Sequence, residues 1–433
     1  MSRLALLQKI LRQMAVLVLK KYDPRIVSVT GSVGKTSAKE AIFTVLSSHF
    51  RVRRNEKNYN NEIGIPLTII GAKSGQGSLL GWLGVFLKWL AVMVSPLEYP
   101  EILILEMGAD RPGDIGYLAD FIRSDVGVIT DVSLSHIEFF KSVEEVGKEK
   151  GTLVRKLAEK NLAILNIDNL QVAKIKEQIK ANVVTVGFNE EAEMRATDYD
   201  FIYSDDDKKE INGLSFKLNY KGTTMPIRLN NVLAKHQIYA ALIAAATGTW
   251  FEMNLVEIAA ALENFQPPCG RMNLLAGIKN SLIIDDTYNS SPTSAIAALE
   301  VLGEIKAGRK IAVMGDMLEL GGETEKGHRA VARKFLESKG DIFFAVGQRM
   351  QFAVEELLKN NFPKENIYSF KDPVETGKKL KTIIQADDLI LVKGSQGLRM
   401  EKAVGEIMLE PQKAGELLCR QDASWKKKPF TEV

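Results

Sequence analysis

Short apolar runs recur along the chain, and stretches with apolar residues at helical spacing separate most of them. Runs rich in Val, Ile and Leu are typical of buried strands. They cover residues 26–30, 102–106, 126–130, 163–166, 282–286, 310–314, 342–346 and 389–393. Their alternation with helical patterns predicts an α/β fold with mainly parallel sheets.

Two segments determine the domain organisation that we expect. Residues 182–230 contain short alternating runs such as SFKLNY, which predict a small antiparallel patch. The stretch Pro267-Pro268-Cys269-Gly270 has the composition of a linker, and a new series of strands and helices follows it. We therefore predict an N-terminal helix in 1–23, a P-loop-type central domain in 24–268 and a Rossmann-like α/β domain in 269–433.

Two longer apolar segments predict helices. Residues 4–22 have apolar side chains at helical spacing, and the absence of a small-residue cleavage site makes this segment a poor signal peptide. Residues 79–94 would extend about 24 Å as a helix, which is less than a hydrocarbon core of about 30 Å. We expect both helices to pack on the protein. The alternative is an interfacial helix at 79–94 that makes peripheral contact with a membrane.

Composition narrows the class of protein. Of the 433 residues, 45% are hydrophobic and 26% are charged, which is the profile of a soluble globular protein of about two or three domains. Lys and Arg number 57 against 54 Asp and Glu, so the charge gives no argument for a nucleic-acid partner. The two cysteines, Cys269 and Cys419, cannot form a disulfide framework, and reduced thiols fit the cytoplasm.

A glycine-rich segment after the first predicted strand indicates a phosphate site. Gly31-Ser32-Val33-Gly34-Lys35-Thr36-Ser37 lies between an apolar run and a helical pattern. The backbone N–H groups of such a loop and the positive end of the helix dipole attract an anion. Lys35 would reach the outer phosphates, and the Thr36 hydroxyl would hold Mg²⁺. The common P-loop has four residues between its glycines and this loop has two, so a turn with a solvated lysine is the alternative.

Polar residues beyond later strands would complete this site. Glu106 ends the run 102–106, where a carboxylate across from a phosphate loop is well placed to bind Mg²⁺. His136 follows the next strand, and Lys150 comes fourteen residues later. A lone histidine is more often structural and a lone lysine is more often solvated. The order of these motifs, rather than any one of them, therefore indicates the site.

The second half of the chain has strand ends of the same kind. The run 282–286 leads into Asp285-Asp286-Thr287-Tyr288-Asn289, and two carboxylates with an amide at a strand end suit recognition of a ribose or an amine. An Asx-type turn before a helix is the alternative. Two further strands are followed by the turn-forming motifs GDMLELGGE and KGS.

These motifs together resemble the Mur ligases, the ATP-dependent amide-forming enzymes of peptidoglycan precursor synthesis. The resemblance covers about residues 24–428 and is strongest to the type that adds D-alanyl-D-alanine to UDP-N-acetylmuramoyl-tripeptide, because DDTYNSSP and GDMLELG favour that type. The motifs that carry it are TGSVGKTSAKE at 30–40, EKNYNNEIGIPLT at 56–68, LEMGADRPGDI at 105–115, DDTYNSSPTS at 285–294, GDMLELG at 315–321 and KGSQGLRMEKAV at 393–404.

The resemblance implies a set of site residues. Residues 31–37 would wrap the phosphates of ATP, Thr36 and Glu106 would bind one Mg²⁺, and His136 would lie near a second. Lys150 matches a lysine that several members of the family carry as a carbamate, so Lys35, His136 and Lys150 are the expected catalytic residues. Further nucleotide contacts are expected from Gln237, Arg271, Asp286 and Asn289, and substrate contacts from Asn58, Asn60, Asn61, Lys393 and Ser395.

The resemblance also implies a reaction. A carboxylate is phosphorylated by ATP, and the amine of the dipeptide then attacks the acyl phosphate. The expected enzyme is a cytoplasmic monomer of cell-wall biogenesis, active in cell shape and division, whose two main domains close on the substrates.

The chain departs from the family pattern at several places. The family has a whole domain before the phosphate loop, which grips the uridine end, whereas one helix precedes the loop here, and recognition of UDP is left open. The apolar insertion 72–98 has no counterpart, and one hypothesis is that it replaces some of the missing contacts. Gln237 and Asp131 each stand where the family often has Asn, and Asp131 adds negative charge near the metals.

Three interpretations therefore compete. The first is the dipeptide-adding ligase. The second is a related ligase that acts on another carboxylate, such as a folate or a poly-amino-acid chain. The third is a nucleotide-binding protein without ligase activity, which the presence of Lys35, Thr36, Glu106, His136 and Lys150 disfavours.

Overall fold

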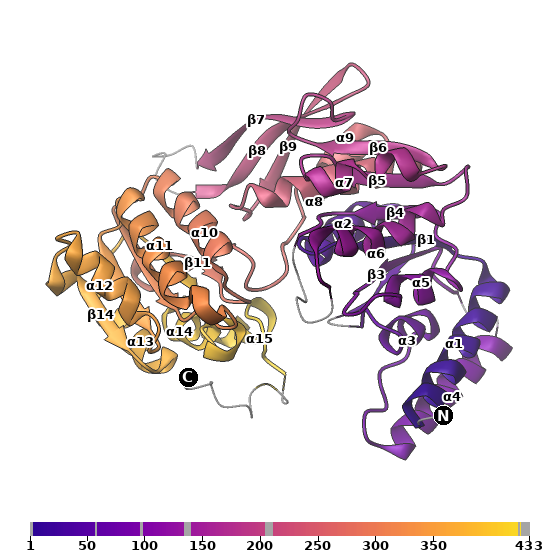
Figure 1. The fold of residues 1–433 in the computed structure, drawn as a ribbon, viewed down its shortest axis with the longest axis horizontal. Coiled ribbons are helices and arrows are strands. Elements are labelled where there is room, and N and C mark those ends of the chain that lie inside the picture. The colour runs from indigo at the N-terminus through magenta and orange to yellow at the C-terminus, as the bar shows by residue number, and fades with distance from the viewer. Residues whose placement is uncertain are drawn as a thin grey trace. The chain divides into compact units, whose positions relative to one another are not determined.

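A computed structural model describes residues 3–56, 59–95, 98–133, 140–203, 211–422 and 425. The chain forms two compact units. The first consists of Met1–Tyr199, Phe216–Arg228 and Lys235–Phe265, and the second of Asp200–Ser215, Leu229–Ala234 and Gln266–Val433. Figure 1 shows the ribbon with its helices and strands labelled.

A nine-stranded sheet with the order β2-β3-β1-β4-β5-β6-β7-β8-β9 organises the first half of the chain. The pairs from β2 to β7 are parallel. The strands are β1 (Arg25–Thr30), β2 (Val52–Arg54), β3 (Ile102–Glu106), β4 (Val126–Ile129), β5 (Leu162–Asn166), β6 (Asn182–Gly187), β7 (Met194–Tyr203), β8 (Ile211–Tyr220) and β9 (Thr223–Asn230). The strand that leads into the glycine-rich loop, β1, is therefore an interior strand of the parallel part, between β3 and β4.

Nine helices accompany these strands in the described part of the chain: α1 (Arg3–Tyr22), α2 (Lys35–Leu46), α3 (Gly64–Ile70), α4 (Leu79–Val94), α5 (Asp114–Ala119), α6 (Val143–Arg155), α7 (Leu170–Ala173), α8 (His236–Trp250) and α9 (Leu255–Leu262). The helices α2 and α8 pack on each other and on the sheet, through β3 and β5 respectively. The helices α1, α3, α4 and α5 contribute to a separate apolar cluster with β3.

The expectation for residues 182–230 was wrong in part. Its first strand, β6, pairs in parallel with β5 and extends the main sheet instead of starting a separate patch. The run VVTVG is mostly apolar, as parallel strands are, and lacks the alternation that marks the later strands. The strands β8 and β9 do form a hairpin, since only Lys221 and Gly222 join them and both have positive φ.

The second unit contains a six-stranded sheet with the order β10-β11-β15-β12-β13-β14. Every pair is parallel except β10 with β11. Its strands are β10 (Asn273–Ala276), β11 (Leu282–Asp286), β12 (Arg309–Gly315), β13 (Ile342–Val346), β14 (Ile367–Phe370) and β15 (Asp388–Lys393). Its helices are α10 (Pro292–Glu304), α11 (Thr324–Glu337), α12 (Gln351–Lys359), α13 (Pro373–Ile383), α14 (Glu401–Ile407) and α15 (Ala414–Leu417).

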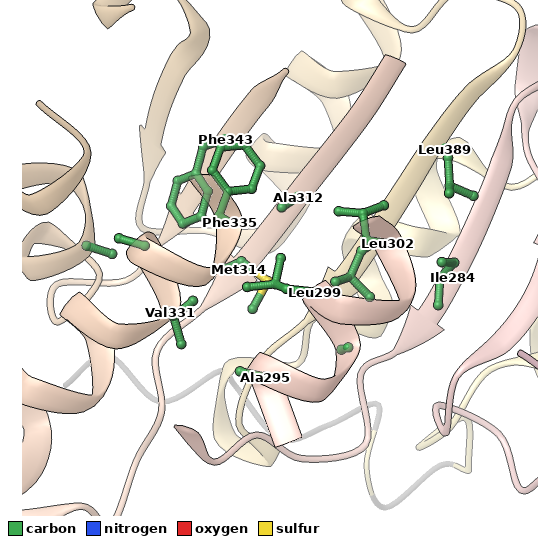
Figure 2. Close-up of a cluster of buried hydrophobic side chains, with 14 of the residues drawn as sticks. Ile284, Ala295, Leu299, Leu302, Ala312, Met314, Val331, Phe335, Phe343 and Leu389 are labelled. Atoms are coloured by element: carbon green, nitrogen blue, oxygen red, sulfur yellow. The ribbon is translucent and has the colours of Figure 1, made fainter. Parts of the chain in front are cut away.

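Consecutive strand residues of this sheet enter two different cores. Ala312 and Phe343 belong to the cluster with α10, α11 and α12, whereas their neighbours Val313 and Phe344 belong to the cluster with α13 and α14. Figure 2 shows the first cluster, in which Leu299 and Phe335 come from helices and Ala312 and Phe343 from strands. Because side chains alternate across a strand, apolar residues at every position produce a sheet that helices cover on both faces. The predicted α/β fold is thus confirmed.

The two apolar helices predicted near the N-terminus are α1 and α4, and they pack on each other. Trp89 Nε1 donates to the Met14 carbonyl over 3.2 Å, and the Tyr22 hydroxyl donates to the Val92 carbonyl over 2.6 Å. Among the described residues, no helix is both long enough and apolar enough to cross a bilayer. Cys269 and Cys419 do not form a disulfide with each other.

Candidate functional site

The register of the parallel strands builds a polar site around the glycine-rich loop. Val29 of β1 lies beside Glu106 of β3, and Thr30 lies beside Ile129 of β4. The carboxyl ends of these three strands therefore meet at one edge of the sheet. The loop of residues 31–34 leaves β1 at this edge, and α2 begins at Lys35.

Close packing against β4 determines the path of the loop. The Ser32 N–H donates to the Asp131 carbonyl over 2.8 Å, and the Thr130 hydroxyl donates to the Val33 carbonyl over 2.5 Å. A Cβ on Gly31 would lie 2.0 Å from Thr130 Oγ1, so only glycine fits there. Gly34, with φ of 84°, turns the chain into α2. The predicted strand, glycine loop and helix are thus present, with the N-terminus of α2 facing the loop as an anion site requires.

The side chain of Lys35 folds back onto this loop. Its Nζ donates to the Gly31 carbonyl over 2.6 Å and to the Ser32 carbonyl over 3.1 Å. The ammonium is thus held at the loop itself, where it can turn toward a bound phosphate. Thr36 and Ser37 follow in the first turn of α2, and the Ser37 side chain is buried.

Glu106 is surrounded by residues from three separate segments. Its Oε2 lies 3.4 Å from the Nζ of Lys39, and its Oε1 accepts a hydrogen bond from the amide of Asn60 over 3.4 Å. Asn55 donates to the Glu106 carbonyl over 3.2 Å and accepts from the Glu106 N–H over 2.8 Å. Lys39 also donates to the Asn55 carbonyl over 2.9 Å. The carboxylate is therefore buried beside one cation in a pocket of amides.

Lys150 lies on α6 and is almost completely buried. Burial, together with the positive charge of Lys35, lowers the pKa of its amine from 10.5 to about 8. The adjacent Glu149 accepts hydrogen bonds from the Gly113 and Ile115 N–H groups, both over 2.8 Å, and so ties α6 to the start of α5. Lys150 is thus a buried lysine of reduced basicity near the loop lysine.

Other residues predicted for this site have different positions. His136 and Asn58 lie outside the described residues. Asn61 uses its side-chain oxygen to accept from the Gly64 N–H over 2.9 Å, which caps α3. Asp131 accepts from Asn169 over 2.7 Å. Within the described part of the chain, no group of three or more His, Cys, Asp or Glu side chains could hold a metal ion.

Gln237 is completely buried in the first turn of α8. Its Nε2 lies 3.3 Å from His236 Nε2, whereas its Oε1 has no hydrogen-bond partner among the described residues. A buried amide oxygen without a donor costs about 1–3 kcal/mol, so a ligand that donates to it would be favoured.

In the second unit, Asp286 and Lys393 are neighbours on adjacent strands. They are register partners in β11 and β15, and the Lys393 Nζ lies 2.6 Å from Asp286 Oδ2. Lys393 also donates to the Asn289 carbonyl over 2.9 Å. Ser395 accepts from the Leu318 N–H over 2.8 Å, which connects it to the GDMLELG segment. These predicted nucleotide and dipeptide residues therefore form one connected cluster.

Asp285 and Arg271 lie at the same strand end. Asp285 Oδ1 accepts from the Thr287 N–H over 3.2 Å, so the Asx-type turn that the sequence left open does form. Burial raises the pKa of Asp285 to about 7. The guanidinium of Arg271 lies 4.1 Å from the ring centre of Tyr288 and stacks on it.

Comparison with known families decides the classification. The Mur ligase middle domain matches residues 86–248, and the Mur ligase glutamate ligase domain matches residues 270–396. Together the two matches cover more than half of the chain. The chain belongs to the Mur ligase family.

Individual relatives agree with this assignment. This Mur ligase is 29% identical, over 402 residues, to the UDP-N-acetylmuramoyl-tripeptide--D-alanyl-D-alanine ligase of Bacillus subtilis, a match that covers 93% of the chain and 79% of the relative. The crystal structure of MurF from Acinetobacter baumannii matches with a TM-score of 0.75 at 23% identity, over 92% of this chain and 80% of that one. The MurF ligase of Thermotoga maritima in complex with ADP matches with a TM-score of 0.72 at 23% identity, over 94% and 84%.

Sequence reasoning missed several residues that shape this Mur ligase's candidate sites. Lys39 and Asn55 both contact Glu106. Asn55 directly follows β2, a strand that the sequence analysis did not predict, and Lys39 lies in the motif at 30–40 but was given no role. Glu401, which is buried between Arg399 and Arg420, was also missed. The one available signal for Lys39 was its position four residues after Lys35, on the same face of the helix.

His328 acquires a structural role that the sequence did not indicate. Its Nε2 accepts from the Met317 N–H over 3.1 Å, and its Nδ1 lies 2.7 Å from the Thr324 carbonyl. Burial lowers the pKa of the imidazole. It therefore anchors the GDMLELG segment to α11.

Proposed function

We propose that this Mur ligase joins D-alanyl-D-alanine to UDP-N-acetylmuramoyl-tripeptide with ATP, in the cytoplasm and as a monomer. The main support is that Lys35, Glu106 and Lys150 all lie around the glycine-rich loop. The path of this loop requires glycine at residue 31. The names of the relatives supply the two substrates. Their match over most of the chain favours this reaction over ligation to another carboxylate.

The first step transfers the γ-phosphoryl group of ATP to the terminal carboxylate of the tripeptide, which yields ADP and an acyl phosphate. Loop residues 31–37 would hold the phosphates through their N–H groups, and Lys35 would leave its two loop carbonyls to neutralise charge on the transferred group. Gln237 would accept a hydrogen bond from the adenine amine through its buried Oε1.

The second step joins the dipeptide. Its amine attacks the carbonyl carbon of the acyl phosphate, the C–O bond to phosphate breaks, and the amine loses a proton as the amide forms. Orientation of the amine against the acyl phosphate contributes about 7–11 kcal/mol in well-aligned reactions. We assign this task to Lys393 and Ser395, and contacts to the nucleotide to Arg271, Asp286 and Asn289. Asn58, Asn60 and Asn61 are the proposed contacts to the muramoyl substrate.

The residues near the loop fit a divalent cation. Glu106 Oε2 is buried and accepts no hydrogen bond from the described residues, and a carboxylate oxygen is a preferred ligand of Mg²⁺. Glu106 and Thr36 would hold the ion, with His136 and Lys150 near a second one. When bound, Mg²⁺ supplies positive charge that balances the phosphate oxygens. Lys39 already neutralises part of the Glu106 charge, so it would help to orient this carboxylate.

Carbamylation of Lys150 is expected in the presence of bicarbonate. Only a neutral amine reacts with CO₂, and a pKa of about 8 makes a large fraction of Lys150 neutral at pH 8, whereas a lysine with a pKa of 10.5 stays charged. ¹³C NMR with labelled bicarbonate should therefore show a carbamate signal that grows as the pH rises from 7 to about 8.5. Lys150→Arg should remove the signal, and Lys148→Arg, at an exposed position of the same helix, should keep it. A signal that survives Lys150→Arg would assign it to another amine.

Phosphate release tests the proposed reaction. The protein is incubated with ATP, Mg²⁺, UDP-N-acetylmuramoyl-tripeptide and D-alanyl-D-alanine, and each component is omitted in turn. Release that needs both organic substrates, together with an amide product of the expected mass, supports the proposal. Release that instead needs another carboxylate, such as a folate, would identify the related ligase. Absence of stimulated release with every substrate would leave a nucleotide-binding protein without ligase activity.

A further inference from the structure

The outer face of α4 is apolar along its whole length and is exposed. Leu79 and Leu80 at its start are 89% and 80% exposed, and Val94 at its end is 74% exposed. The exposed apolar side chains of this helix are Leu79, Leu80, Leu83, Phe86, Leu87, Leu90 and Val94, and we call them the outer stripe. Leu79, Leu83, Leu87, Leu90 and Val94 recur at intervals of three or four residues, so they share one side of the helix.

The opposite side of α4 is covered by the protein itself. Val85 and Val92 are buried, and Trp82 and Trp89 pack against the same apolar cluster. This packing explains why α4 forms, but it accounts for only the inner half of an almost entirely apolar helix. Burial of the outer stripe needs a partner outside the first unit, because large exposed apolar patches mark interaction surfaces.

The helix α1 extends the exposed apolar surface. Met14 contacts Trp89, and Lys21 and Tyr22 contact the carbonyls of the last turn of α4, so the two helices run in the same direction. Figure 1 shows them side by side at the edge of the first unit. The first turns of α1 add the exposed apolar side chains of Leu4, Leu6 and Ile10.

The charged side chains on α1 and α4 themselves have one sign. Neither α1 nor α4 contains Asp or Glu. The exposed lysines Lys9 and Lys20 lie on α1, and Lys88 lies on α4. A pair of helices that exposes both leucines and lysines matches the acyl chains and anionic headgroups of a lipid leaflet. The outer stripe also lacks the Tyr, Trp and Arg anchors that protein interfaces favour.

We propose that the outer stripe of α4, with the first turns of α1, rests on the surface of an anionic membrane. The helix would lie in the plane of the interface, since its length of about 24 Å is too short for it to cross a bilayer. The proposed membrane contact does not involve the glycine-rich loop, and it does not depend on the proposed ligase reaction.

Vesicle flotation of the full chain, without ATP or substrates, tests the proposal. The wild type should float with vesicles of phosphatidylcholine mixed with phosphatidylglycerol, less with phosphatidylcholine alone, and less at high salt. Leu83→Glu/Leu87→Glu changes two side chains that are 52% and 54% exposed, so the fold should persist, which circular dichroism checks. Its partition coefficient should fall at least about tenfold. Lys9→Gln/Lys88→Gln should remove most of the preference for anionic vesicles.

Leu170→Glu/Leu409→Glu is the matched control, because it places the same charges at exposed leucines outside α1 and α4, and it should float like the wild type. A wild type that stays with the soluble fraction in both vesicle types would overturn the proposal, as would undiminished flotation of Leu83→Glu/Leu87→Glu. Sedimentation velocity tests the alternative that a second copy of the chain covers the outer stripe. A dimer that this variant dissociates, without vesicle binding by the wild type, would assign the outer stripe to a second copy of the chain and overturn the membrane proposal.

Discussion

Replacement of Lys35 by alanine should lower the kcat of the ligase reaction by about 10²–10³-fold, the usual effect of removing one group that stabilises transition-state charge. The Lys35 ammonium lies within hydrogen-bond distance of the loop carbonyls of Gly31 and Ser32, so it is held beside the loop, from which it would turn to the outer phosphates of a bound nucleotide. Phosphoryl transfer depends on charge neutralisation more than on covalent help. The loss should therefore appear in kcat, measured as amide product under saturating substrates.

Lys326→Ala is the control for this variant, because Lys326 is exposed on α11. Among the described residues, its one ion pair is with Glu323, which is also exposed. It should retain wild-type kcat. The Lys35→Ala protein should also keep the wild-type melting temperature, since the loop path depends on Gly31 and Thr130 and not on the lysine head. Wild-type kcat in a folded Lys35→Ala protein would refute the phosphoryl-transfer role of the loop.

The Glu401→Gln substitution should destabilise the second unit by about 3–5 kcal/mol, the range observed when one partner of a buried ion pair is neutralised. Glu401 is only 1% exposed, with Arg399 Nε 2.6 Å from one carboxylate oxygen and Arg420 Nη1 3.0 Å from the other. Arg420 also donates to the carbonyls of Thr287 and Tyr288. A neutral amide at 401 would leave two buried guanidinium groups without their shared countercharge, and the segment after β11 would lose its anchor.

Hydrogen exchange of the full chain, read by mass spectrometry over β11 and β15, measures this loss as a lower opening free energy. The matched control is Glu410→Gln, which removes a carboxylate from an exposed pair with Lys413. Exposed pairs contribute about 0–1 kcal/mol, so this control should leave exchange almost unchanged. Equal protection in the Glu401→Gln and wild-type proteins would show that the arginines are satisfied without the carboxylate.

Local patterns were sufficient to predict the parallel strands and the glycine loop. The runs at 102–106, 282–286 and 342–346 are strands with the predicted bounds, because each contains a continuous apolar run, as buried parallel strands do. The loop of residues 31–37 was equally readable, since its strand, glycines, lysine and helix are contiguous in the chain. Residues 182–187 were placed in the wrong kind of sheet because alternation in the later strands outweighed their apolar run.

What the sequence by itself determined is therefore the buried central strands and the chemistry that is contiguous along the chain, whereas the short strands β2, β10 and β14 were not predicted. The tertiary structure decided which distant side chains meet. Lys39, Asn55 and Asn60 surround Glu106 only because β2, β3 and α2 assemble in one register, and Glu401 joins Arg420 only through the fold of the C-terminal segment. It also decided which side of α4 is covered, because a helix that is apolar on nearly every side carries no pattern that distinguishes its buried face from its exposed one.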